Sequence, residues 1–242
     1  MRRPCVGRLS QDLLGGVVHL TSDTHFSHAN IIRYCDRPFS DLTVMNERLV
    51  DAWNDRVRPD DEIWHLGDVA MGRIEKSLLI IRRLHGRKFL VPGNHDRCWP
   101  GHKKVGDWPE KYTAAGFTLL PRSRTLTLAG REVLLCHFPY RGDSREVDRY
   151  RDERPADEGR WLLHGHVHER WRQRGRQINV GVDVWDYAPV SLETIEGVIR
   201  AGKADLDRSG NPAPARDADT PETGARDQGG STGRSSSRVS GQ

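Results

Sequence analysis

Residues 17–28 read VVHLTSDTHFSH, and this stretch decides how the rest of the chain is interpreted. The short apolar run at residues 17–21 predicts a buried strand, and residues 22–28 then form a polar turn. Asp23 and His25 lie just past the end of this strand, one residue apart. A carboxylate and an imidazole placed together in this way are typical metal-ion ligands.

Four more predicted strands are followed directly by polar segments of the same kind. These strands occupy residues 62–66, 88–91, 132–136 and 161–164. The segments after them are Gly67-Asp68, Gly93-Asn94-His95-Asp96, His137 and Gly165-His166-Val167-His168. Because the carboxyl ends of strands in an open α/β sheet line one crevice, we expect all five segments to converge on one site.

The side chains of these segments offer carboxylate, imidazole and amide groups, which suit Mn, Fe or Zn. At a strand end, side chains two residues apart point the same way, so the pairs at 23–25 and 166–168 can each reach one ion. Asp68 has two oxygens, enough to bridge two cations about 3.5–4 Å apart. Asn94 can bind through its carbonyl oxygen without adding negative charge. Cysteine is missing from the set, which argues against a structural zinc site.

Each motif taken alone also has an ordinary structural explanation. A Gly-Asp or Gly-Asn pair usually marks a turn, and a histidine near a strand end is usually a surface or capping residue. It is the order of residue types, repeated at the ends of five strands, that indicates a metal site.

The order D-x-H, G-D, G-N-H-D, H, G-H-x-H resembles the calcineurin-like metallophosphoesterase superfamily, from residue 18 to about residue 184. The resemblance implies an α/β fold, a four-layer αββα sandwich of two mixed sheets flanked by helices, with a two-metal site. His95 matches the position that contacts the substrate phosphate and assists the leaving group, and His164 matches no ligand. By match to the motif, Asp23, His25 and His168 would hold the first ion, Asn94, His137 and His166 the second, and Asp68 would bridge them.

The protein Ser/Thr phosphatase branch of this superfamily is a poor match. That branch reads GDxVDRG and GNHE, whereas residues 67–73 here read GDVAMGR and the later motif ends in Asp96. The run SDTHFSHANIIRYCDRPF at residues 22–39 instead resembles small bacterial and phage members. Because Met71 replaces the second acidic residue, any carboxylate that orients His95 would have to be Asp96 or Asp183.

These residues predict a metal-dependent hydrolase of phosphate esters. Two cations would lower the pKa of a shared water, and the resulting hydroxide would attack phosphorus in line with the leaving oxygen. Asp68 and His95 form the catalytic set, and Asn94 and His95 contact the substrate. Manganese is the expected metal, with Fe, Zn or Ni as alternatives. We expect a phosphodiesterase for nucleotide or nucleic-acid-derived substrates; the alternatives are a phosphomonoesterase of small metabolites and a non-catalytic scaffold.

Two weaker features bear on substrate binding. His28 follows the D-x-H motif and would either touch the substrate or cap the next helix, and capping is favoured. Four arginines alternate with other residues over residues 170–176, and on a strand they would share one face close to Trp171. A nucleic-acid contact at these arginines is an alternative to a solvated hairpin, which is favoured.

The composition is compatible with this function without demonstrating it. The chain of 242 residues has a formal net charge of +4 and a mean hydropathy of −0.71, and mild basicity suits anionic substrates. Four scattered cysteines without a CxxC pair favour reduced thiols and a cytoplasmic location. No apolar run approaches the roughly 20 residues that cross a bilayer, and the start lacks a signal-peptide pattern, so no membrane partner is expected.

The polar, Gly- and Pro-rich composition after residue 200 predicts a disordered tail at 201–242. A loose arm is expected at residues 1–15, with one domain at 16–200 between them. Helices are predicted around residues 44–53, with Asp41 or Thr43 as N-cap, around 74–84, and from Ser191 onward. Further strands are expected at residues 117–120, 125–128 and 177–182, and the charged segment 140–160 is predicted to be a surface excursion.

Overall fold

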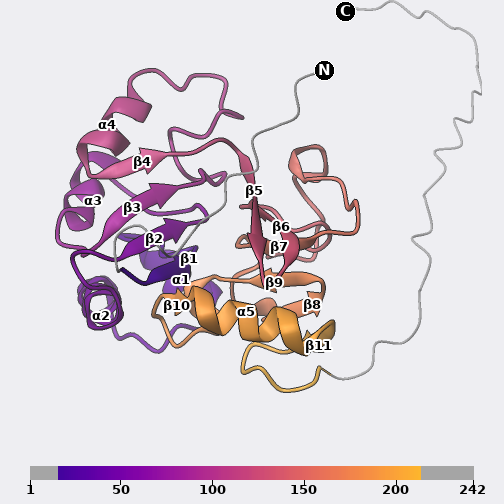
Figure 1. Cartoon of the computed structure of the whole chain (residues 1–242). Coiled ribbons are helices and arrows are strands. Elements are labelled where there is room, and N and C mark those ends of the chain that lie inside the picture. Colours follow the sequence, from indigo (N-terminus) through magenta and orange to yellow (C-terminus); the bar gives the residue numbers. More distant parts are fainter. Residues whose placement is uncertain (1–15, 214–242) are drawn as a thin grey trace, which may run out of the picture.

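Two mixed β-sheets form the middle of the structure, a computed structural model that describes residues 16–213 (Figure 1). The first sheet has the order β10-β1-β2-β3-β4. Its first four strands in sequence are parallel, and the short β10 pairs antiparallel with β1 at the edge. The strands are β1 (Val18–Thr21), β2 (Glu62–His65), β3 (Arg87–Leu90), β4 (Phe117–Leu119) and β10 (Val190–Ser191).

The second sheet has the order β11-β8-β9-β7-β6-β5. Its centre is parallel, because β7 pairs in parallel with both β6 and β9, and antiparallel pairs flank this centre on each side. The strands are β5 (Ser123–Leu128), β6 (Arg131–Cys136), β7 (Trp161–His164), β8 (Gln173–Gly175), β9 (Gln177–Asn179) and β11 (Ala204–Leu206).

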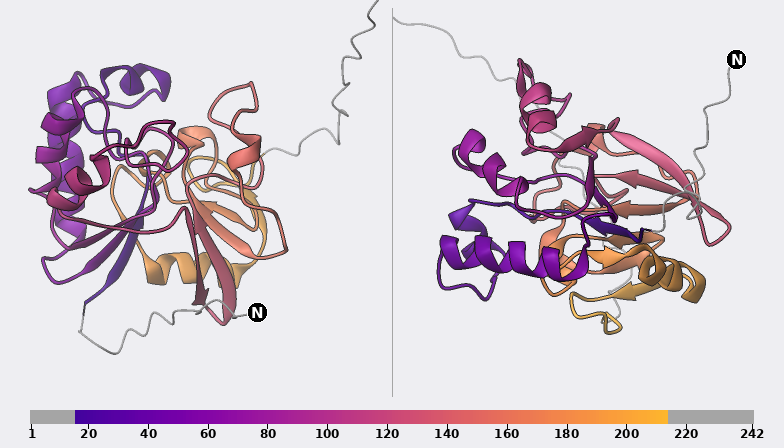
Figure 2. Two further views of the ribbon diagram at one scale, coloured as in Figure 1. Left: turned by 90° about the horizontal axis from the view of Figure 1, so that it is seen from above. Right: turned by 60° about the vertical axis from the view of Figure 1, so that its left-hand side comes forward.

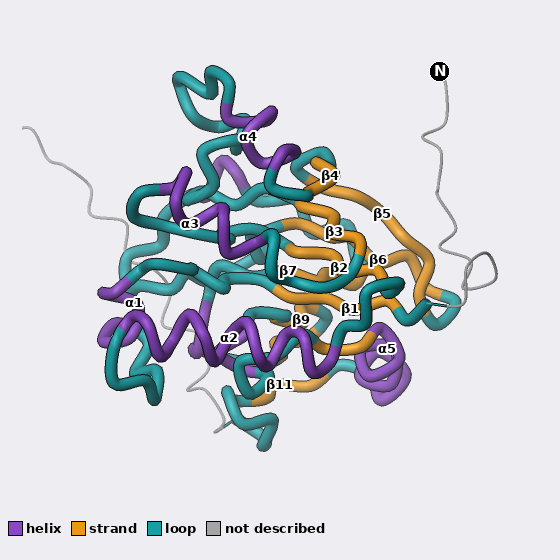
Figure 3. The backbone as a smooth tube through the Cα atoms, turned by 90° about the vertical axis from the view of Figure 1, so that its left-hand side faces the viewer, coloured by secondary structure: helices purple, strands orange, loops and turns teal. Residues whose placement is uncertain are grey.

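Four helices cover the outer face of the first sheet, as Figure 3 shows. The longest, α2, begins after Asp41, whose carboxylate accepts a hydrogen bond from the Val44 N–H, so one of the two predicted N-caps is confirmed. Its buried residues Met45, Leu49 and Trp53 recur at helical spacing and face the sheet. These helices are α1 (Ala29–Tyr34), α2 (Leu42–Arg56), α3 (Ile74–Ile81) and α4 (Trp108–Ala114).

A second apolar core lies between the two sheets, which form separate layers in Figure 2. Strand alternation explains this core, because Val133 and Leu135 of β6 face the first sheet while Leu134 faces the other way. The helix α5 (Leu192–Ala201) begins at the predicted cap Ser191 and adds Ile195 to the same core. The prediction of two mixed sheets flanked by helices is therefore confirmed.

The structure differs from the predicted elements in three places. The strand expected at 177–182 ends at Asn179, because the Val182 N–H bonds to the Ser22 carbonyl and residues Val182–Val184 form a 3-10 turn. The second sheet extends past the boundary expected at residue 200, because β11 pairs with β8. The segment 140–160 includes a 3-10 turn, Arg151–Glu153, and packs on the second sheet. The arm at residues 1–15 and tail residues 214–242 lie outside the described residues.

Candidate metal centre

The five predicted segments meet where strands of both sheets reach their carboxyl ends. Backbone hydrogen bonds join them directly: the Asp23 N–H donates to the Gly67 carbonyl at 3.0 Å, and the His25 N–H donates to the Asp68 carbonyl at 3.1 Å. In the second sheet, the Gly165 N–H donates to the His137 carbonyl at 3.0 Å. The convergence expected from the sequence is therefore present, and it brings together segments from both sheets.

The first group of ligand atoms consists of two carboxylates and two imidazoles. The His25 and His168 Nε2 atoms are 3.2 Å apart, and Asp23 Oδ1 lies 3.9 and 3.6 Å from them, respectively. Asp68 Oδ2 lies 3.7 Å from His25 Nε2. The ligand atoms of these four side chains all lie within 4.8 Å of one another, a spacing compatible with one shared ion.

The second group consists of Asn94, His137 and His166. The Asn94 Oδ1 atom lies 3.1 Å from His137 Nε2 and 3.1 Å from His166 Nδ1. The other ring nitrogen of His137, Nδ1, is 2.8 Å from the Leu66 carbonyl, which fixes the direction in which Nε2 points. One amide oxygen and two imidazole nitrogens therefore face the same small volume.

Asp68 lies between the two groups. Its Oδ2 atom is 3.7 Å from His25 Nε2 in the first group and 3.5 Å from His137 Nε2 in the second. Its Oδ1 atom accepts a hydrogen bond from the His95 N–H at 2.8 Å. The position of this carboxylate is the one that a bridging ligand between two cations requires.

The backbone brings these side chains together in a way that the sequence argument did not anticipate. We expected residues two apart to point the same way because they continue a strand. Instead, β1 and β7 end at Thr21 and His164, and five of the seven candidate ligands adopt left-handed backbone conformations that non-glycine residues rarely take. The φ values are 56° for Asp23, 49° for His25, 60° for Asp68, 71° for His166 and 48° for His168.

Gly165 allows the second sheet to approach the first at this point. A Cβ atom built on Gly165 would overlap both Ser22 Oγ and Asp23 Oδ2. The next residue, His166, donates its backbone N–H to the same Asp23 Oδ2 at 3.0 Å. A residue with a side chain at position 165 would therefore push the D-x-H segment away from the G-H-x-H segment.

The charges at the site fit divalent cations. Burial raises the pKa of Asp23 and of Asp68, because an enclosed carboxylate loses the hydration that stabilises its negative charge. Burial also lowers the pKa of His25, His137 and His168, which leaves neutral imidazoles, the form that binds metal. Asp23 Oδ1 is buried without a hydrogen-bond partner among the described residues, as expected for an atom reserved for an ion.

Asp143 is a supporting residue that the sequence analysis missed. Its Oδ2 atom lies 3.3 Å from His166 Nε2, and its Oδ1 atom accepts from Arg149 at 2.7 Å. Burial opposes ionisation of Asp143, but the hydrogen bonds from His166 and Arg149 outweigh it and lower the pKa of this carboxyl. Gly142-Asp143 repeats the pair at 67–68 but follows no strand, so its place in the chain offered little reason to include it.

Cys35 plays a comparable part at His168. Its Sγ atom lies 3.2 Å from His168 Nδ1, on the side of the ring away from the first group. Burial raises the pKa of the Cys35 thiol, so this sulfur stays protonated and neutral beside the imidazole ring. Cys35, Cys98 and Cys136 are all buried and free, as expected for reduced thiols, and Cys5 lies outside the described residues.

His95 lies beside the ligand groups, with its ring centroid 5.5 Å from that of His25. Asp96 and Asp183 were the two carboxylates suggested to orient it; among residues 16–213 neither forms a hydrogen bond with the His95 ring, although the charge of Asp96 acts on the pKa of His95. Both oxygens of Asp96 accept backbone N–H groups, including those of Asp68 and Gly93, and Asp183 pairs with Arg37. These carboxylates shape the surrounding loops instead.

The weaker candidates occupy different positions. His28 is the N-cap residue of α1 but makes no capping hydrogen bond with its side chain, and its ring lies 5.3 Å from that of His25. His164 is fully buried, and its Nδ1 atom contacts the Gly165 carbonyl at 2.7 Å, outside both ligand groups.

The arginines at residues 170–176 do not form the one-faced stripe that a continuous strand would give. Only Gln173–Gly175 is a strand, and it forms the favoured hairpin with β9. Arg172 donates to the Val184 carbonyl at 2.9 Å and lies over the Trp185 ring, whereas Arg174 lies over Trp171. This segment therefore gives no support to a nucleic-acid contact.

Residues 17–185 match the sequence model of the calcineurin-like phosphoesterase superfamily domain. The chain belongs to this superfamily. Membership implies a phosphate-ester substrate and divalent metal ions, for which the carboxylate and imidazole groups provide a candidate site. Among residues 16–213, no helix has the length and apolar character that a bilayer crossing requires.

Relatives within the superfamily extend over most of the chain. The uncharacterized protein MJ1445 of Methanocaldococcus jannaschii is 32% identical over 77% of this chain and 93% of its own length. The gene 66 protein of Mycobacterium phage D29 is 35% identical over 72% of this chain and 92% of its own. The solved structure of AQ665 from Aquifex aeolicus, a protein of unknown function, has a TM-score of 0.57 at 27% identity, covering 76% of this chain and 99% of that one.

Proposed function

We propose that this calcineurin-like phosphoesterase binds two divalent ions and hydrolyses phosphodiesters. Manganese is the metal we expect at both positions. The position of Asp68 carries the proposal, because one carboxylate oxygen lies within 3.7 Å of a ring nitrogen in each ligand group. Asp23, His25 and His168 would hold one ion, and Asn94, His137 and His166 the other. When bound, the ions would supply positive charge for the phosphoryl oxygens and an activated water.

A cavity beside His95 supports an organic phosphate ester as the substrate. It has a volume of about 210 Å³, and its wall continues from Asn94 and His95 away from the ligand groups. The residues that line it are Met71, Gly72, Ile74, Asn94, His95, Arg97 and His102. This mixture of apolar and basic side chains gives room for an organic group on a phosphate held at Asn94, which a phosphate ester has and inorganic phosphate lacks.

His95 would act on the departing oxygen. Its backbone N–H is fixed to Asp68 at 2.8 Å, so the ring is held at the boundary between ligand groups and cavity. Burial lowers the pKa of His95; the negative charge of Asp96 opposes this shift, and the positive charges of Arg149 and Arg145 add to it. In its protonated form the ring would give a proton to the leaving alkoxide oxygen, a contribution typically worth about 10²–10⁴-fold in rate.

The test compares bis-p-nitrophenyl phosphate with p-nitrophenyl phosphate, with Mn²⁺ and with chelator. We expect metal-dependent cleavage of the diester in preference to the monoester. His95→Asn should keep its bound metal and lose about 10²–10⁴-fold in kcat. His85→Asn is the matched control, because His85 contacts the Val57 carbonyl in another part of the molecule.

Each other result contradicts a defined part of the proposal. A preference for the monoester would assign the site to small phosphorylated metabolites. Full activity in His95→Asn would remove His95 from the mechanism. Absence of bound metal together with absence of turnover on either ester would indicate a scaffold that has kept the fold without the reaction.

A further inference from the structure

A second polar pocket lies at the opposite end of the second sheet from the ligand groups. Arg131 begins β6 and Trp161 begins β7, whereas His137 and His166 follow the other ends of these strands. The pocket has a volume of about 670 Å³, within the usual range of about 300–1,000 Å³ for small-molecule sites. It is therefore separate from the metal centre and large enough for more than a single phosphate.

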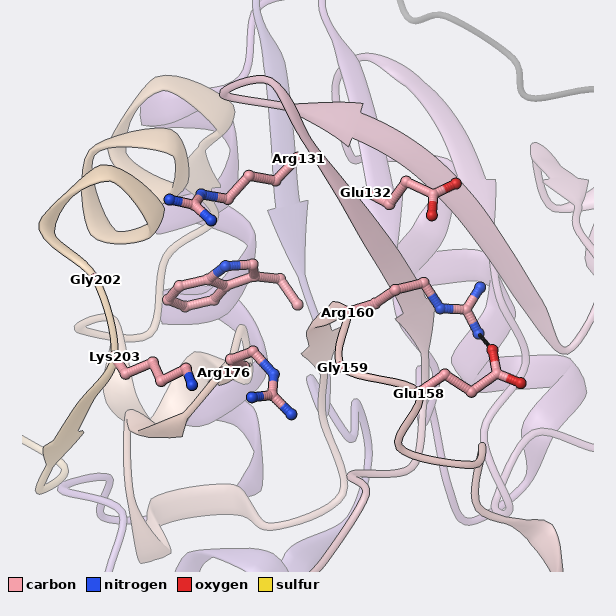
Figure 4. Close-up of a pocket in the computed structure, with 9 residues that line it drawn as sticks. Arg131, Glu132, Glu158, Gly159, Arg160, Arg176, Gly202 and Lys203 are labelled. Carbon is pink, nitrogen blue, oxygen red and sulfur yellow. Dashed lines mark hydrogen bonds and ion pairs between the residues drawn. The ribbon is translucent and has the colours of Figure 1, made fainter.

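Positively charged side chains from three separate segments gather on one side of this pocket. Figure 4 shows Arg131 from β6, Arg176 from the β8–β9 turn and Lys203 from the end of α5 arranged in this way. Arg176 forms an ion pair with Asp157, with Nη2 and Oδ1 2.9 Å apart. Arg131 and Lys203 form no ion pair with any residue of the described part, 16–213.

The acidic residues of the pocket do not neutralise these two cations. Glu158 forms an ion pair with Arg160 at 2.6 Å on the other side of the pocket (Figure 4). Glu132 follows Arg131 directly on β6, so strand alternation sends the two side chains to opposite faces. The side formed by Arg131 and Lys203 therefore keeps its positive charge, which a bound anion would compensate.

We propose that this pocket binds an oligophosphate anion, a chain of at least two phosphate groups. The planar guanidinium of Arg131 can hold one phosphate through two parallel hydrogen bonds, and Lys203 supplies a point charge for a neighbouring phosphate. Trp161 also lines the pocket, but it is only 5% exposed and packs in the core between the sheets, so the two cations carry the recognition. The inference does not rest on the proposed catalytic function.

The experiment is a calorimetric titration of the full-length, metal-loaded protein with pyrophosphate and with ADP, repeated after metal removal with EDTA. We expect one binding event that persists in EDTA. Because two charge-assisted contacts are lost together, Arg131→Ser/Lys203→Ser should weaken this event by about 100-fold or more. Tighter binding of ADP would identify a nucleotide as the ligand, and equal binding a bare oligophosphate.

The matched control is Lys103→Ser/Lys104→Ser, which removes the same charge from an exposed loop. An equal loss of affinity in this control would show that only the net charge of the protein affects anion binding, and it would overturn the proposal. Wild-type affinity in the Arg131/Lys203 variant, or absence of binding to either anion, would also overturn it. Hydrolysis of bis-p-nitrophenyl phosphate by the Arg131/Lys203 variant should stay at the wild-type rate, and thermal unfolding checks that this variant is folded.

Discussion

The guanidinium of Arg37 and the carboxylate of Asp183 form a buried, two-pronged ion pair. Nε lies 2.8 Å from Oδ1 and Nη2 lies 2.9 Å from Oδ2. The same guanidinium donates to the carbonyls of Asp23 at 2.8 Å and Thr24 at 3.1 Å. Arg37 thereby joins the loop after β1, which carries two of the candidate ligands, to the 3-10 turn at Val182–Val184.

We expect Arg37→Met to lower the free energy of unfolding by about 3–5 kcal/mol, because it leaves Asp183 buried and unpaired. Urea denaturation measures this loss. Arg83→Met is the control, because Arg83 pairs with Glu47 through side chains that are 47% and 49% exposed, and it should change stability by less than about 1 kcal/mol. The double variant Arg37→Met/Asp183→Leu should recover part of the loss. Equal effects of Arg37→Met and the control would show that the buried pair is dispensable.

Removing the Asp143 carboxylate should weaken metal binding at the second ligand group. Asp143 lies 3.3 Å from His166 Nε2, and loss of such a partner typically lowers metal affinity about 10–100-fold. Titration of Asp143→Ala with Mn²⁺ measures the effect, and Asp143→Asn should fall between this variant and the wild type. Asp148→Ala is the control in the same segment, because Asp148 pairs with Arg151 and Arg154 instead. Unchanged affinity in Asp143→Ala would contradict the positioning role.

Gly165→Ala and Gly197→Ala should have opposite effects. The new methyl group at position 165 overlaps Ser22 Oγ and Asp23 Oδ2, so we expect a loss of about 1–3 kcal/mol in stability and weaker Mn²⁺ binding. At Gly197, inside α5, a Cβ meets nothing within 4 Å, and the better helix propensity of alanine should stabilise the protein by up to about 1 kcal/mol. Denaturation curves with and without Mn²⁺ measure both. A neutral Gly165→Ala variant would mean that the two sheets can separate at the site without penalty.

Asp61 should make stability depend on acidic pH. Burial opposes its ionisation, but hydrogen bonds from the Arg58 and Val17 N–H groups outweigh burial and lower its pKa from 3.8 to about 2. Because the folded-state pKa is the lower one, the stabilisation is fully present above the pKa of the unfolded chain. It disappears as the pH falls toward 2, and it amounts to about 2 kcal/mol.

Urea unfolding of Asp61→Asn and wild type, measured from pH 7 down to pH 3, tests this expectation. The difference in unfolding free energy should be largest at pH 7 and shrink toward acid. The neighbouring Asp60→Asn serves as control, because the Asp60 side chain is exposed. A difference in unfolding free energy that stays constant with pH would show that the stabilisation does not depend on the ionised form of Asp61.

The sequence predicted the two sheets and the meeting of five segments because both follow from local patterns. Short apolar runs predict strands, and polar residues at the ends of parallel strands must share one edge. The orientation of the ligands did not follow, because Asp23 and Asp68 leave the strand conformation for left-handed turns. Such turns are stabilised by contacts between distant segments, which a local pattern does not contain.

The supporting residues escaped prediction for the same reason. Asp143 meets His166 across 23 residues, and Arg37 meets Asp183 across 146 residues, so neither pair leaves a local signal. The short helices α1 and α4, with six and seven residues, span too few turns for a clear apolar periodicity. The strand β11 has only three residues in a polar stretch, and pairing with β8 stabilises it.

The position of β1 inside the first sheet has a consequence for biosynthesis. This strand emerges early from the ribosome, and β2 pairs with one of its edges soon afterwards. The other edge stays unpaired until β10, Val190–Ser191, has been synthesised. A nascent chain therefore carries an open, apolar strand edge through most of translation, the kind of surface that chaperones shield from aggregation. The last candidate ligand, His168, also arrives late, so metal loading has to follow translation of nearly the whole fold.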